Sequence, residues 1–472
     1  MEHRPESFTP AADESSRFFT ETAGSSRRHS PAGSLMRRRG AGKGLQLFLC
    51  ILAAAVFLGT AGCSDSDSDD LVLTDATWIA FQDGDGPWQE LEIDPETPSF
   101  TPEVSDPDGR YGLAFVVARA AGDAEEKGYV QTITLQTTTA DLPEIDFSSL
   151  LGSGEIPAEV TVPGEFDFGT WSHLYAGDEN ESVWSEETAV MLDPSFVPYD
   201  LVAALHTDGK YYPSKLVMKS LPGDLVSGDV WEVTIDFDAD PDVQNLSGPY
   251  PIDLGGTVMH YGEVYLRTAN NTLASLGRDD QDSETSFEYT ALSDLPEGGM
   301  YLLELSIDLS ESSSLLYFEG FSEAGNPDLA QNMPDSFDGE FAADTSTGYL
   351  LPGMTWEAEY PSAIAYAGVF RGTGGGIDYK ATTLVTAGRQ GAQSGLTMPD
   401  LRAAQGWHPL WSVPSDAVES YNSASVVLSS AAIQDFLLPS LTSLYLAYCP
   451  RLEDGDWIAA IANYRQAAGD PL

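Results

Sequence analysis

Residues that could act as catalytic bases are few and isolated. The chain holds 6 His, and those downstream of its N-terminal apolar run are His173, His206, His260 and His408. None of them lies beside a Gly-x-Ser-x-Gly nucleophile turn. No His-Glu-x-x-His or paired-cysteine spacing offers a set of zinc ligands. The sequence therefore assigns no catalytic residue, no metal ligand and no cofactor, and we expect a protein that is not an enzyme.

Carboxylates are the abundant class of reactive side chain. The chain has 74 Asp+Glu against 22 Lys+Arg, a formal net charge of −52. This charge opposes binding to nucleic acid and to anionic lipid headgroups. Two carboxylates at a suitable separation could hydrolyse glycosides, although a sequence does not show which acids meet. An exported carboxylate-dependent hydrolase therefore stays open as an alternative.

Two acidic clusters are candidate calcium sites. The stretch Asp83 to Pro87 alternates carboxylates with glycine, but Pro87 falls where an EF-hand loop needs its third ligand. We interpret it as a hairpin turn. A second cluster is expected to share one strand face before a turn at Pro241, and consists of Asp236, Asp238, Asp240 and Asp242. We interpret the acids as a solvated surface, with calcium binding as the alternative.

Aromatic residues offer the clearest binding signal. Trp407 and Trp411 flank Pro409 at the end of a Gly/Ala-rich segment, Arg371 to Gln405, which we expect to be a long irregular loop. Exposed rings there could stack on sugars or peptide side chains, so both tryptophans are candidate ligand-binding residues. The alternative is that both rings close the end of a β-sandwich, because large aromatics dominate cores. The glycine run Gly372 to Gly376 precedes no helix, which argues against a phosphate loop.

The elements that position these residues are predicted to be strands. Short period-2 runs separated by Gly, Pro, Asp and Asn indicate an all-β protein built of tandem β-sandwich domains. The expected strands include Thr77–Phe81, Trp88–Ile93, Tyr111–Val117, Val130–Thr139, Tyr199–His206, Tyr211–Met218, Trp231–Phe237, Gly262–Arg267, Ser286–Tyr289, Gly299–Ile307, Leu315–Phe318, Thr355–Tyr360 and Ile364–Phe370.

The end of the chain is expected to differ. In Asp454 to Ala468 the apolar residues Trp457, Ile458, Ile461 and Tyr464 have helical spacing, which predicts a short C-terminal helix docked on a sheet. Just before it, Leu441 to Cys449 fits the core of one leucine-rich repeat. A single copy cannot bury its face, so we interpret it as an apolar strand with Cys449 inside.

The N-terminal part predicts export. Leu45 to Ala61 is apolar apart from Gln46, and Arg37, Arg38, Arg39 and Lys43 precede it. The run is shorter than the roughly 20 apolar residues of a membrane span, so it is interpreted as a cleaved signal. Met36 looks like the start of this signal. Whether translation begins at Met1 or Met36 stays open.

The end of this signal, Leu58 to Cys63, resembles the lipobox of bacterial lipoproteins, with Thr60 where Leu is usual. The resemblance implies that Cys63 is diacylated and becomes the new N-terminus; the alternative is an ordinary signal in which Cys63 is incidental. The like-charged run Ser64 to Asp70 would form an extended tether. Ser64 after the cysteine implies sorting to an outer membrane, with a periplasmic or cell-surface face.

Two weaker resemblances bear on the folded part. Phe196 to Ala203 resembles the Pro-x-Gly-x-Tyr-x-Leu signature of transthyretin-like or carboxypeptidase-regulatory-like β-sandwich modules, without the Gly before Tyr199. The segment around Trp78, Trp88 and Gly109–Gly112 looks like the opening of uncharacterised exported lipoproteins of Gram-negative bacteria. Both resemblances imply a scaffold and transfer no catalytic residue.

These patterns divide the chain into six parts. Residues 1–35 are a disordered extension, 36–62 the lipoprotein signal peptide, 63–75 the acidic tether, 76–150 a β domain, 151–244 a transthyretin-like β-sandwich, and 245–472 a β-sandwich region with the long loop and C-terminal helix. Cys50 leaves with the signal and Cys63 is acylated, so Cys449 has no cysteine to pair with.

The leading hypothesis is a lipid-anchored cell-envelope β-sandwich protein with a non-catalytic scaffold or adhesion role. Its expected partners are the membrane, through the lipid anchor, and a glycan or an envelope protein, with no nucleic acid. The alternatives are a carbohydrate- or calcium-binding surface module and, behind it, the carboxylate-dependent hydrolase.

Overall fold

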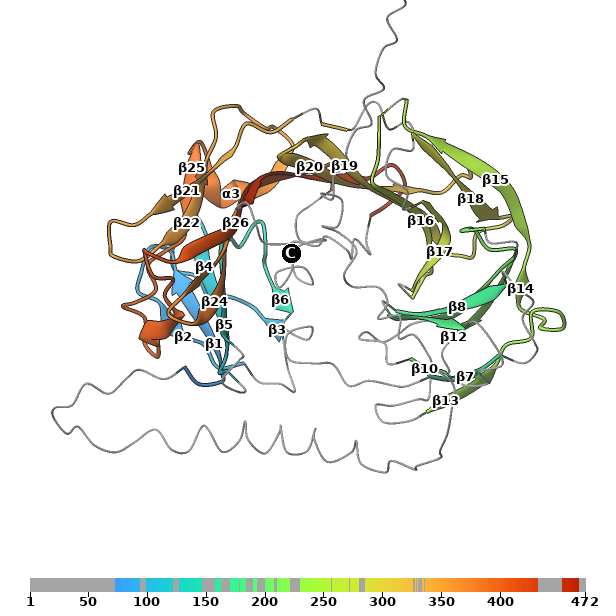
Figure 1. Cartoon of the computed structure of the whole chain (residues 1–472), viewed down its shortest axis with the longest axis horizontal. Coiled ribbons are helices and arrows are strands. Elements are labelled where there is room, and N and C mark those ends of the chain that lie inside the picture. The colour runs from blue at the N-terminus through green and yellow to red at the C-terminus, as the bar shows by residue number, and fades with distance from the viewer. Residues whose placement is uncertain are drawn as a thin grey trace, which may run out of the picture. The chain divides into compact units, whose positions relative to one another are not determined.

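Figure 1 shows a computed structural model of the whole chain. The structure describes residues 73–466 except 94–98, 122–126, 147–157, 163–169, 178, 184–189, 193–199, 208–209, 221–229, 256, 271, 280–284, 326, 328, 330–332, 335 and 432–451. All of these belong to one compact unit, Leu73–Pro471. The predicted signal peptide, residues 63–72 of the predicted tether, and Leu441 to Cys449 lie outside the described residues. The last three residues of the predicted tether are described, and Leu73 among them is buried.

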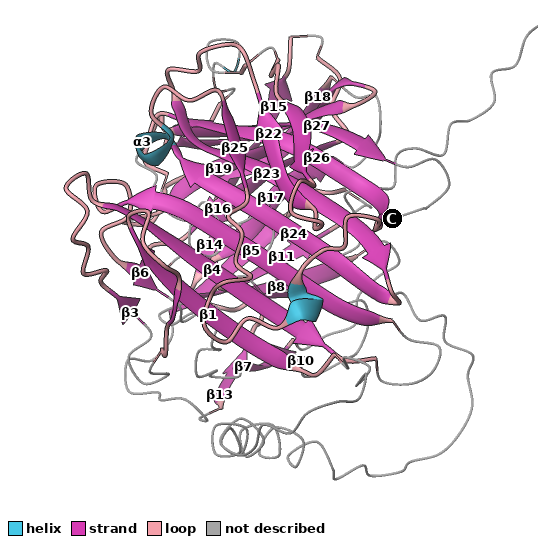
Figure 2. Cartoon of the chain, turned by 90° about the vertical axis from the view of Figure 1, so that its left-hand side faces the viewer, coloured by secondary structure: helices cyan, strands magenta, loops and turns pink. Residues whose placement is uncertain are grey.

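The described part is an all-β protein with several sheets, as predicted. The largest has 12 strands, in the spatial order β17-β16-β19-β20-β27-β26-β23-β24-β5-β4-β1-β2 (Figures 1 and 2). In chain order these are β1 (Ala76–Asp83), β2 (Gln89–Glu90), β4 (Arg110–Arg119), β5 (Gly128–Thr138), β16 (Tyr261–Arg267), β17 (Leu273–Asp279), β19 (Met300–Ser310), β20 (Ser313–Phe321), β23 (Ala363–Gly374), β24 (Ile377–Thr386), β26 (Val418–Ser429) and β27 (Trp457–Gln466).

One parallel pair joins the N-terminal strands of this sheet to strands from the C-terminal half of the chain. β5 pairs with β24 in parallel register over Gly128–Gln136, whereas the other pairs within this sheet are antiparallel. A buried hydrogen bond from Thr134 Oγ1 to Thr383 Oγ1 (3.1 Å) links the two strands across the sheet face. The expected regions 76–150 and 245–472 therefore share one sheet. In Figure 1 the blue and cyan strands β1, β4 and β5 accordingly lie beside orange β24.

Smaller sheets complete the described fold. Their strand orders are β14-β12-β11-β8-β9, β10-β7-β13, β21-β22-β25, β15-β18 and β3-β6. The bounds are β3 (Ser99–Phe100), β6 (Ile145–Asp146), β7 (Ala158–Thr161), β8 (Trp171–Ala176), β9 (Glu179–Val183), β10 (Val190–Leu192), β11 (Asp200–His206), β12 (Lys215–Ser220), β13 (Trp231–Thr234), β14 (Val243–Gln244), β15 (Leu246–Asp253), β18 (Ser286–Leu292), β21 (Glu340–Asp344), β22 (Leu351–Thr355) and β25 (Gly395–Thr397).

Several predicted strands are confirmed. β1 and β2 form the expected antiparallel hairpin, and the N–H of Gly86 donates to the carbonyl of Asp83 (2.9 Å) in its turn. β4 is a buried central strand between β1 and β5. β11 and β12 pair in antiparallel register as expected. The predicted strand Trp231–Phe237 is shorter in the structure: β13 ends at Thr234, and it pairs in parallel with β7.

The predicted C-terminal helix is wrong, because Trp457–Gln466 is strand β27, paired with β20 and β26. The neighbours Ile458 and Ala459 are both fully buried, and so is Ile461. A strand that is buried on both faces carries a nearly continuous apolar run. Such a run also satisfies helical spacing, and the sequence pattern alone cannot separate the two structures.

The predicted loop from Arg371 to Gln405 is also wrong over most of its first half. β23 continues to Gly374, and β24 runs from Ile377 into a short helix, α3 (Ala387–Gln390). Gly375 (φ 60°) and Gly376 (φ 79°) form the two-residue turn between the strands. Both positions need the left-handed backbone region, which explains the glycine run better than a ligand loop does.

The predicted strand face of aspartates is not formed. Asp236 lies beyond the end of β13 and accepts hydrogen bonds from the N–H groups of Asp238 and Ala239 (3.0 and 3.1 Å). This is an Asx turn, in which the carboxylate accepts the backbone hydrogen bonds that a neighbouring strand would otherwise accept.

In the described part of the chain, none of the helices has the length and apolar character needed to span a bilayer.

Candidate binding pocket at a tryptophan cluster

The structure brings the two predicted tryptophans together with a third. Trp78 lies on β1, Trp407 in the segment after β25, and Trp411 in a short 3-10 helix, η2 (Pro409–Trp411). The ring centroids of Trp78 and Trp407 are 5.4 Å apart, those of Trp407 and Trp411 are 5.5 Å apart, and those of Trp78 and Trp411 are 5.8 Å apart. Edge-to-face contacts at these distances are favourable for aromatic pairs.

Local hydrogen bonds hold the segment in place. Gly406 has φ 81°, and a Cβ there would approach Trp78 Nε1 to 2.9 Å, so the turn that delivers Trp407 requires glycine. The Trp78 indole donates to the carbonyl of Gln405 (3.2 Å). His408 Nδ1 accepts from the N–H of Leu410 (3.3 Å) and caps η2, which begins at Pro409.

The three rings differ in exposure. Trp78 is 4% exposed and Trp411 is 7% exposed, whereas Trp407 is half-buried. The Trp407 indole N–H donates to Ser412 Oγ (3.1 Å), which leaves its ring plane as the part that can meet a ligand. Trp411 therefore supports the cluster from within, and its role as a direct ligand contact stays a prediction.

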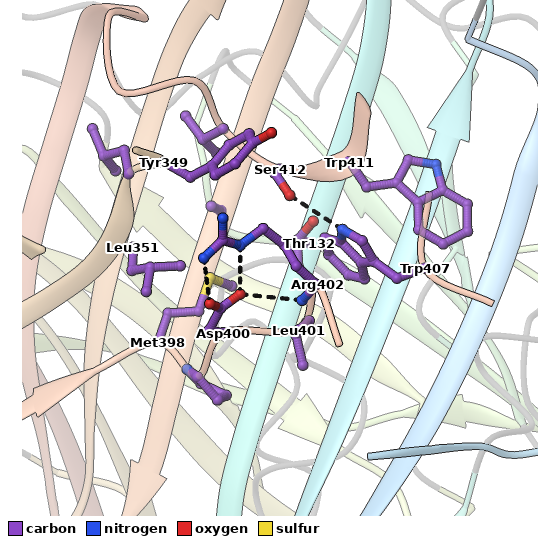
Figure 3. A pocket seen from close by; sticks show the side chains of 14 residues that line it. Thr132, Tyr349, Leu351, Met398, Asp400, Leu401, Arg402, Trp407, Trp411 and Ser412 are labelled. Carbon is purple, nitrogen blue, oxygen red and sulfur yellow. Dashed lines mark hydrogen bonds and ion pairs between the residues drawn. The ribbon is translucent and has the colours of Figure 1, made fainter. Parts of the chain in front are cut away.

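A small pocket lies beside the cluster (Figure 3). Its volume is about 20 Å³, room for about one water molecule. Most of its walls are apolar: Leu350, Leu351, Ala381, Met398, Pro399, Leu401, Trp407, Trp411 and Val413. The polar lining residues are Thr132, Tyr349, Asp400, Arg402 and Ser412. The pocket is therefore lined by residues of strands β5 and β24 and of the segment that follows β25.

The charged lining residues are already paired. Arg402 donates to both carboxylate oxygens of Asp400, from Nε (2.8 Å) and from Nη2 (2.6 Å), as the dashed lines in Figure 3 show. These hydrogen bonds hold the pKa of Asp400 below its ordinary value. The guanidinium also lies 4.6 Å from the centroid of the Tyr349 ring, a cation-π contact. Neither charge is placed to act as an acid or a base.

Thr132 is the polar group without a partner in this pocket. It lies on β5, is 4% exposed, and its hydroxyl has no hydrogen-bond partner among the described residues. A buried hydroxyl in this state favours any water or ligand that brings a hydrogen bond to it. The arrangement can therefore hold a small polar group at the base of an apolar recess, with the Trp407 ring at its side.

Sequence reasoning missed a cluster on β8 and β11. The ring centroids of His173 and His206 are 5.3 Å apart, and Trp171 stacks on His206 at 5.1 Å and 2°. Burial lowers the pKa of His173 to about 3 and that of His206 to about 4. Both rings are therefore neutral at pH 7. The cluster results from the register of the two strands, which pairs His173 with Ala204 and Trp171 with His206. No sequence motif predicts it.

A pair of carboxylates also meets. Glu263 on β16 and Glu304 on β19 are directly opposite each other, and the Tyr265 hydroxyl lies 2.7 Å from Glu263 Oε2 and 2.9 Å from Glu304 Oε2. A glycosidase needs open space between its two carboxyl groups for the scissile bond. Here the tyrosine oxygen fills that space, so the pair does not favour the hydrolase alternative.

The acids weighed as calcium ligands have protein partners. Asp83 accepts from the N–H groups of Ser105 and Asp106 (3.0 and 3.2 Å). Lys219 Nζ donates to Asp240 and Asp242, both at 2.6 Å, and Lys215 pairs with Asp238. Within the described residues, no group of three or more His, Cys, Asp or Glu side chains is arranged to hold a metal ion.

Comparison with known proteins indicates no function for this chain. A scan against protein-family models finds none that matches the chain. A search of curated proteins finds no similar sequence.

Proposed function

We propose that this chain is a lipid-anchored protein of the bacterial cell envelope, with a non-catalytic scaffold or adhesion role. The anchor is Cys63, acylated after cleavage of the signal peptide, and the folded β unit is the part that is presented. Acyl chains contribute about 0.8 kcal/mol for each CH₂ buried in the bilayer, so two or more chains would hold a large domain firmly.

The observation that carries this proposal is how soon the chain enters the folded unit after Cys63. Leu73 is 8% exposed and packs in the same core as Trp78 and Val130. Asp75 accepts a hydrogen bond from the N–H of Ala120 (2.7 Å), next to β4. Between Cys63 and Leu73 the sequence holds only the acidic run and two further residues, a spacing suited to a short tether from membrane to domain.

The charge of the chain supports the same setting. A formal net charge of −52 keeps a presented domain soluble and away from anionic headgroups, and it disfavours nucleic acid as a partner. We place the protein at an outer membrane, on its periplasmic or cell-surface face, and expect a glycan or an envelope protein as the partner.

Mass spectrometry and fractionation test the anchor. The purified protein is expected to begin at Cys63 with acyl chains on that residue and to partition with membranes. Cys63→Ala should leave the signal uncleaved or release the protein from membranes. Cys449→Ala, which removes the other cysteine expected in the mature chain, is the matched control and should change neither result. An unmodified thiol at position 63 would refute the proposal.

A second candidate function is carbohydrate binding at the tryptophan pocket. The observation that favours it is the half-buried Trp407 ring beside the unpartnered Thr132 hydroxyl. A neutral sugar could stack on the ring and place one hydroxyl group in the recess. Titration of the protein with neutral oligosaccharides should then quench Trp fluorescence, and both Trp407→Ala and Thr132→Val should abolish the effect. Quenching that is unchanged in both variants would exclude this site.

A further inference from the structure

Strands β23 and β24 place two cations directly opposite each other. Arg371 on β23 pairs in register with Lys380 on β24. The same row continues on both sides, because Lys380 pairs with Gln131 on β5 and Arg371 pairs with Tyr421 on β26. Residues paired in register point to the same face of a sheet. Four neighbouring strands thus present one polar row, and each of its side chains is half-buried.

One aromatic ring lies against the Arg371 guanidinium, and others lie nearby. Its Cζ atom lies 5.5 Å from the centroid of the Tyr421 ring, and Tyr421 stacks on Tyr464 at 6.3 Å and 20°. Tyr129 lies two residues before Gln131, on the same face of β5, and its hydroxyl donates to Gln131 Oε1 (2.9 Å). We call Tyr129, Arg371, Lys380 and Tyr421 the Arg371 site.

The Arg371 site is costly to the fold. Like charges that face each other across two strands repel, and partial burial strengthens this repulsion. The cost is visible at Lys380, where burial and then the charge of Arg371 lower the pKa to about 8. Arg371 Nε is buried and has no hydrogen-bond partner among the described residues.

Two acids lie near the row on the same strands. Asp378 on β24 accepts from Lys127 Nζ (3.1 Å) and from Thr373 Oγ1 (2.7 Å), so its charge is directed to another cation. Glu419, two residues before Tyr421 on β26, pairs in register with Gly372. The buried Nε donor of Arg371 is satisfied by neither of them.

We propose that the Arg371 site binds the carboxylate of an acidic saccharide. The guanidinium supplies donors for a planar oxygen pair, and Lys380 supplies a second positive charge beside it. The Tyr129 ring provides apolar surface on which a sugar ring can pack, while the Tyr421 ring holds the guanidinium in place. A sulfate group has the same anionic oxygen chemistry, so the test must separate a carboxylate-bearing sugar from a simple oxyanion. This site is distinct from the tryptophan pocket.

Isothermal titration of the purified full-length protein at low ionic strength tests the proposal, with digalacturonate, maltose and inorganic sulfate as probes. Digalacturonate should bind, and Arg371→Gln should weaken its binding at least about tenfold. Arg465→Gln is the matched control. Arg465 is exposed on β27, one residue before the Gln466 that pairs with Tyr421, so it lies on the opposite face of the same sheet.

A second variant keeps the test informative if Arg371→Gln does not fold. Lys380→Gln should also weaken digalacturonate binding, and it should remove the loss of affinity that the wild-type protein shows between pH 7 and pH 9, as Lys380 loses its proton. Trp407→Ala should leave digalacturonate binding unchanged. Equal binding of maltose or of sulfate, equal affinity in Arg371→Gln and Arg465→Gln, or loss of binding in Trp407→Ala would each overturn the proposal.

Discussion

Glu263 and Glu304 face each other across β16 and β19, and both contact the hydroxyl of Tyr265. The Tyr261 hydroxyl also contacts Glu263 Oε2 and lies 3.2 Å from the Tyr265 hydroxyl. These residues make four oxygen–oxygen contacts: each tyrosine hydroxyl contacts Glu263, the two hydroxyls contact each other, and Tyr265 contacts Glu304. The two tyrosine hydroxyls supply only two protons for them. If both tyrosines donate to Glu263, the contact between Tyr265 and Glu304 is a hydrogen bond only when Glu304 is itself protonated.

The pKa values of these side chains agree with a protonated Glu304. Burial, followed by the charge of Glu263, raises the pKa of Glu304 to about 7. Burial and the two carboxylates also raise the pKa of Tyr265 well above its ordinary value, so the tyrosine keeps its proton. Glu304 is therefore a neutral hydrogen-bond donor below pH 7 and becomes a second, half-buried negative charge above it.

The first prediction concerns the pH dependence of stability. A carboxyl group whose pKa rises from 4.5 to about 7 on folding binds more protons in the folded state. Its contribution to the free energy of unfolding is therefore complete below pH 4.5 and is lost as the pH rises through 7. Urea denaturation at pH 5 and pH 8 should show a loss from this group on the order of 1–2 kcal/mol, discounted for its partial exposure.

Two variants isolate that contribution. Glu304→Gln keeps a donor for Tyr265 and cannot ionise. The difference in free energy of unfolding between this variant and the wild-type protein should therefore change as the pH passes through 7. Glu288→Gln removes an exposed carboxylate from β18 and should follow the wild-type curve. A Glu304→Gln curve that parallels the wild-type curve from pH 5 to pH 8 would contradict the proton assignment.

A second prediction concerns the unpartnered hydroxyl of Thr132. Valine has nearly the shape of threonine without the hydroxyl, so Thr132→Val should raise the free energy of unfolding by on the order of 1 kcal/mol. Thr134→Val is the matched control on the same strand, because the Thr134 hydroxyl donates to Thr383 (3.1 Å). That variant should lose about 1 kcal/mol. Equal losses in both variants would mean that Thr132 has a partner in solution.

A third prediction tests the turn between β23 and β24. Gly376 has φ 79°, and an added Cβ would meet nothing within 4 Å, so any cost of a side chain comes from the backbone. Gly376→Ala should lower the free energy of unfolding by about 1–2 kcal/mol. Gly376→Asn should lower it less, since asparagine adopts the left-handed region more readily than alanine. Urea denaturation of the two variants measures the difference.

The fold class followed from patterns that are local in sequence. The alternation in β1, the Asp83–Gly86 turn and the apolar run of β4 depend on a few adjacent residues, and the structure confirms them. The turn of the β23-β24 hairpin is equally local. The sequence nevertheless predicts a loop there, because Gly375 and Gly376 lie in a wider stretch of small residues, where Ala381, Thr382 and Thr383 are buried strand positions.

The candidate sites could not be predicted in the same way. Trp78 meets Trp407 only because β1 belongs to a sheet whose parallel β5-β24 pair joins distant parts of the chain. The pairing of Glu263 with Glu304 depends on strand register, which a sequence does not reveal. Trp407 and Trp411 were identifiable because tryptophans around a proline are distinctive by themselves, whereas Thr132 is one threonine among many.

The last prediction distinguishes strand β27 from the helix that its spacing suggests. Ala459 is fully buried, in register with Tyr317 on β20 and Leu428 on β26, while Ile458 and Ala460 point to the other face. Ala459→Asp would bury a charge without a partner, and we expect it to cost more than about 3 kcal/mol or to prevent folding. Arg465→Asp, at an exposed position of the same strand, should change the stability by about 0.5 kcal/mol or less. Thermal denaturation of the two variants gives the comparison. Near-equal stabilities would mean that Ala459 faces solvent, which would contradict its burial in the core beside Tyr317 and Leu428.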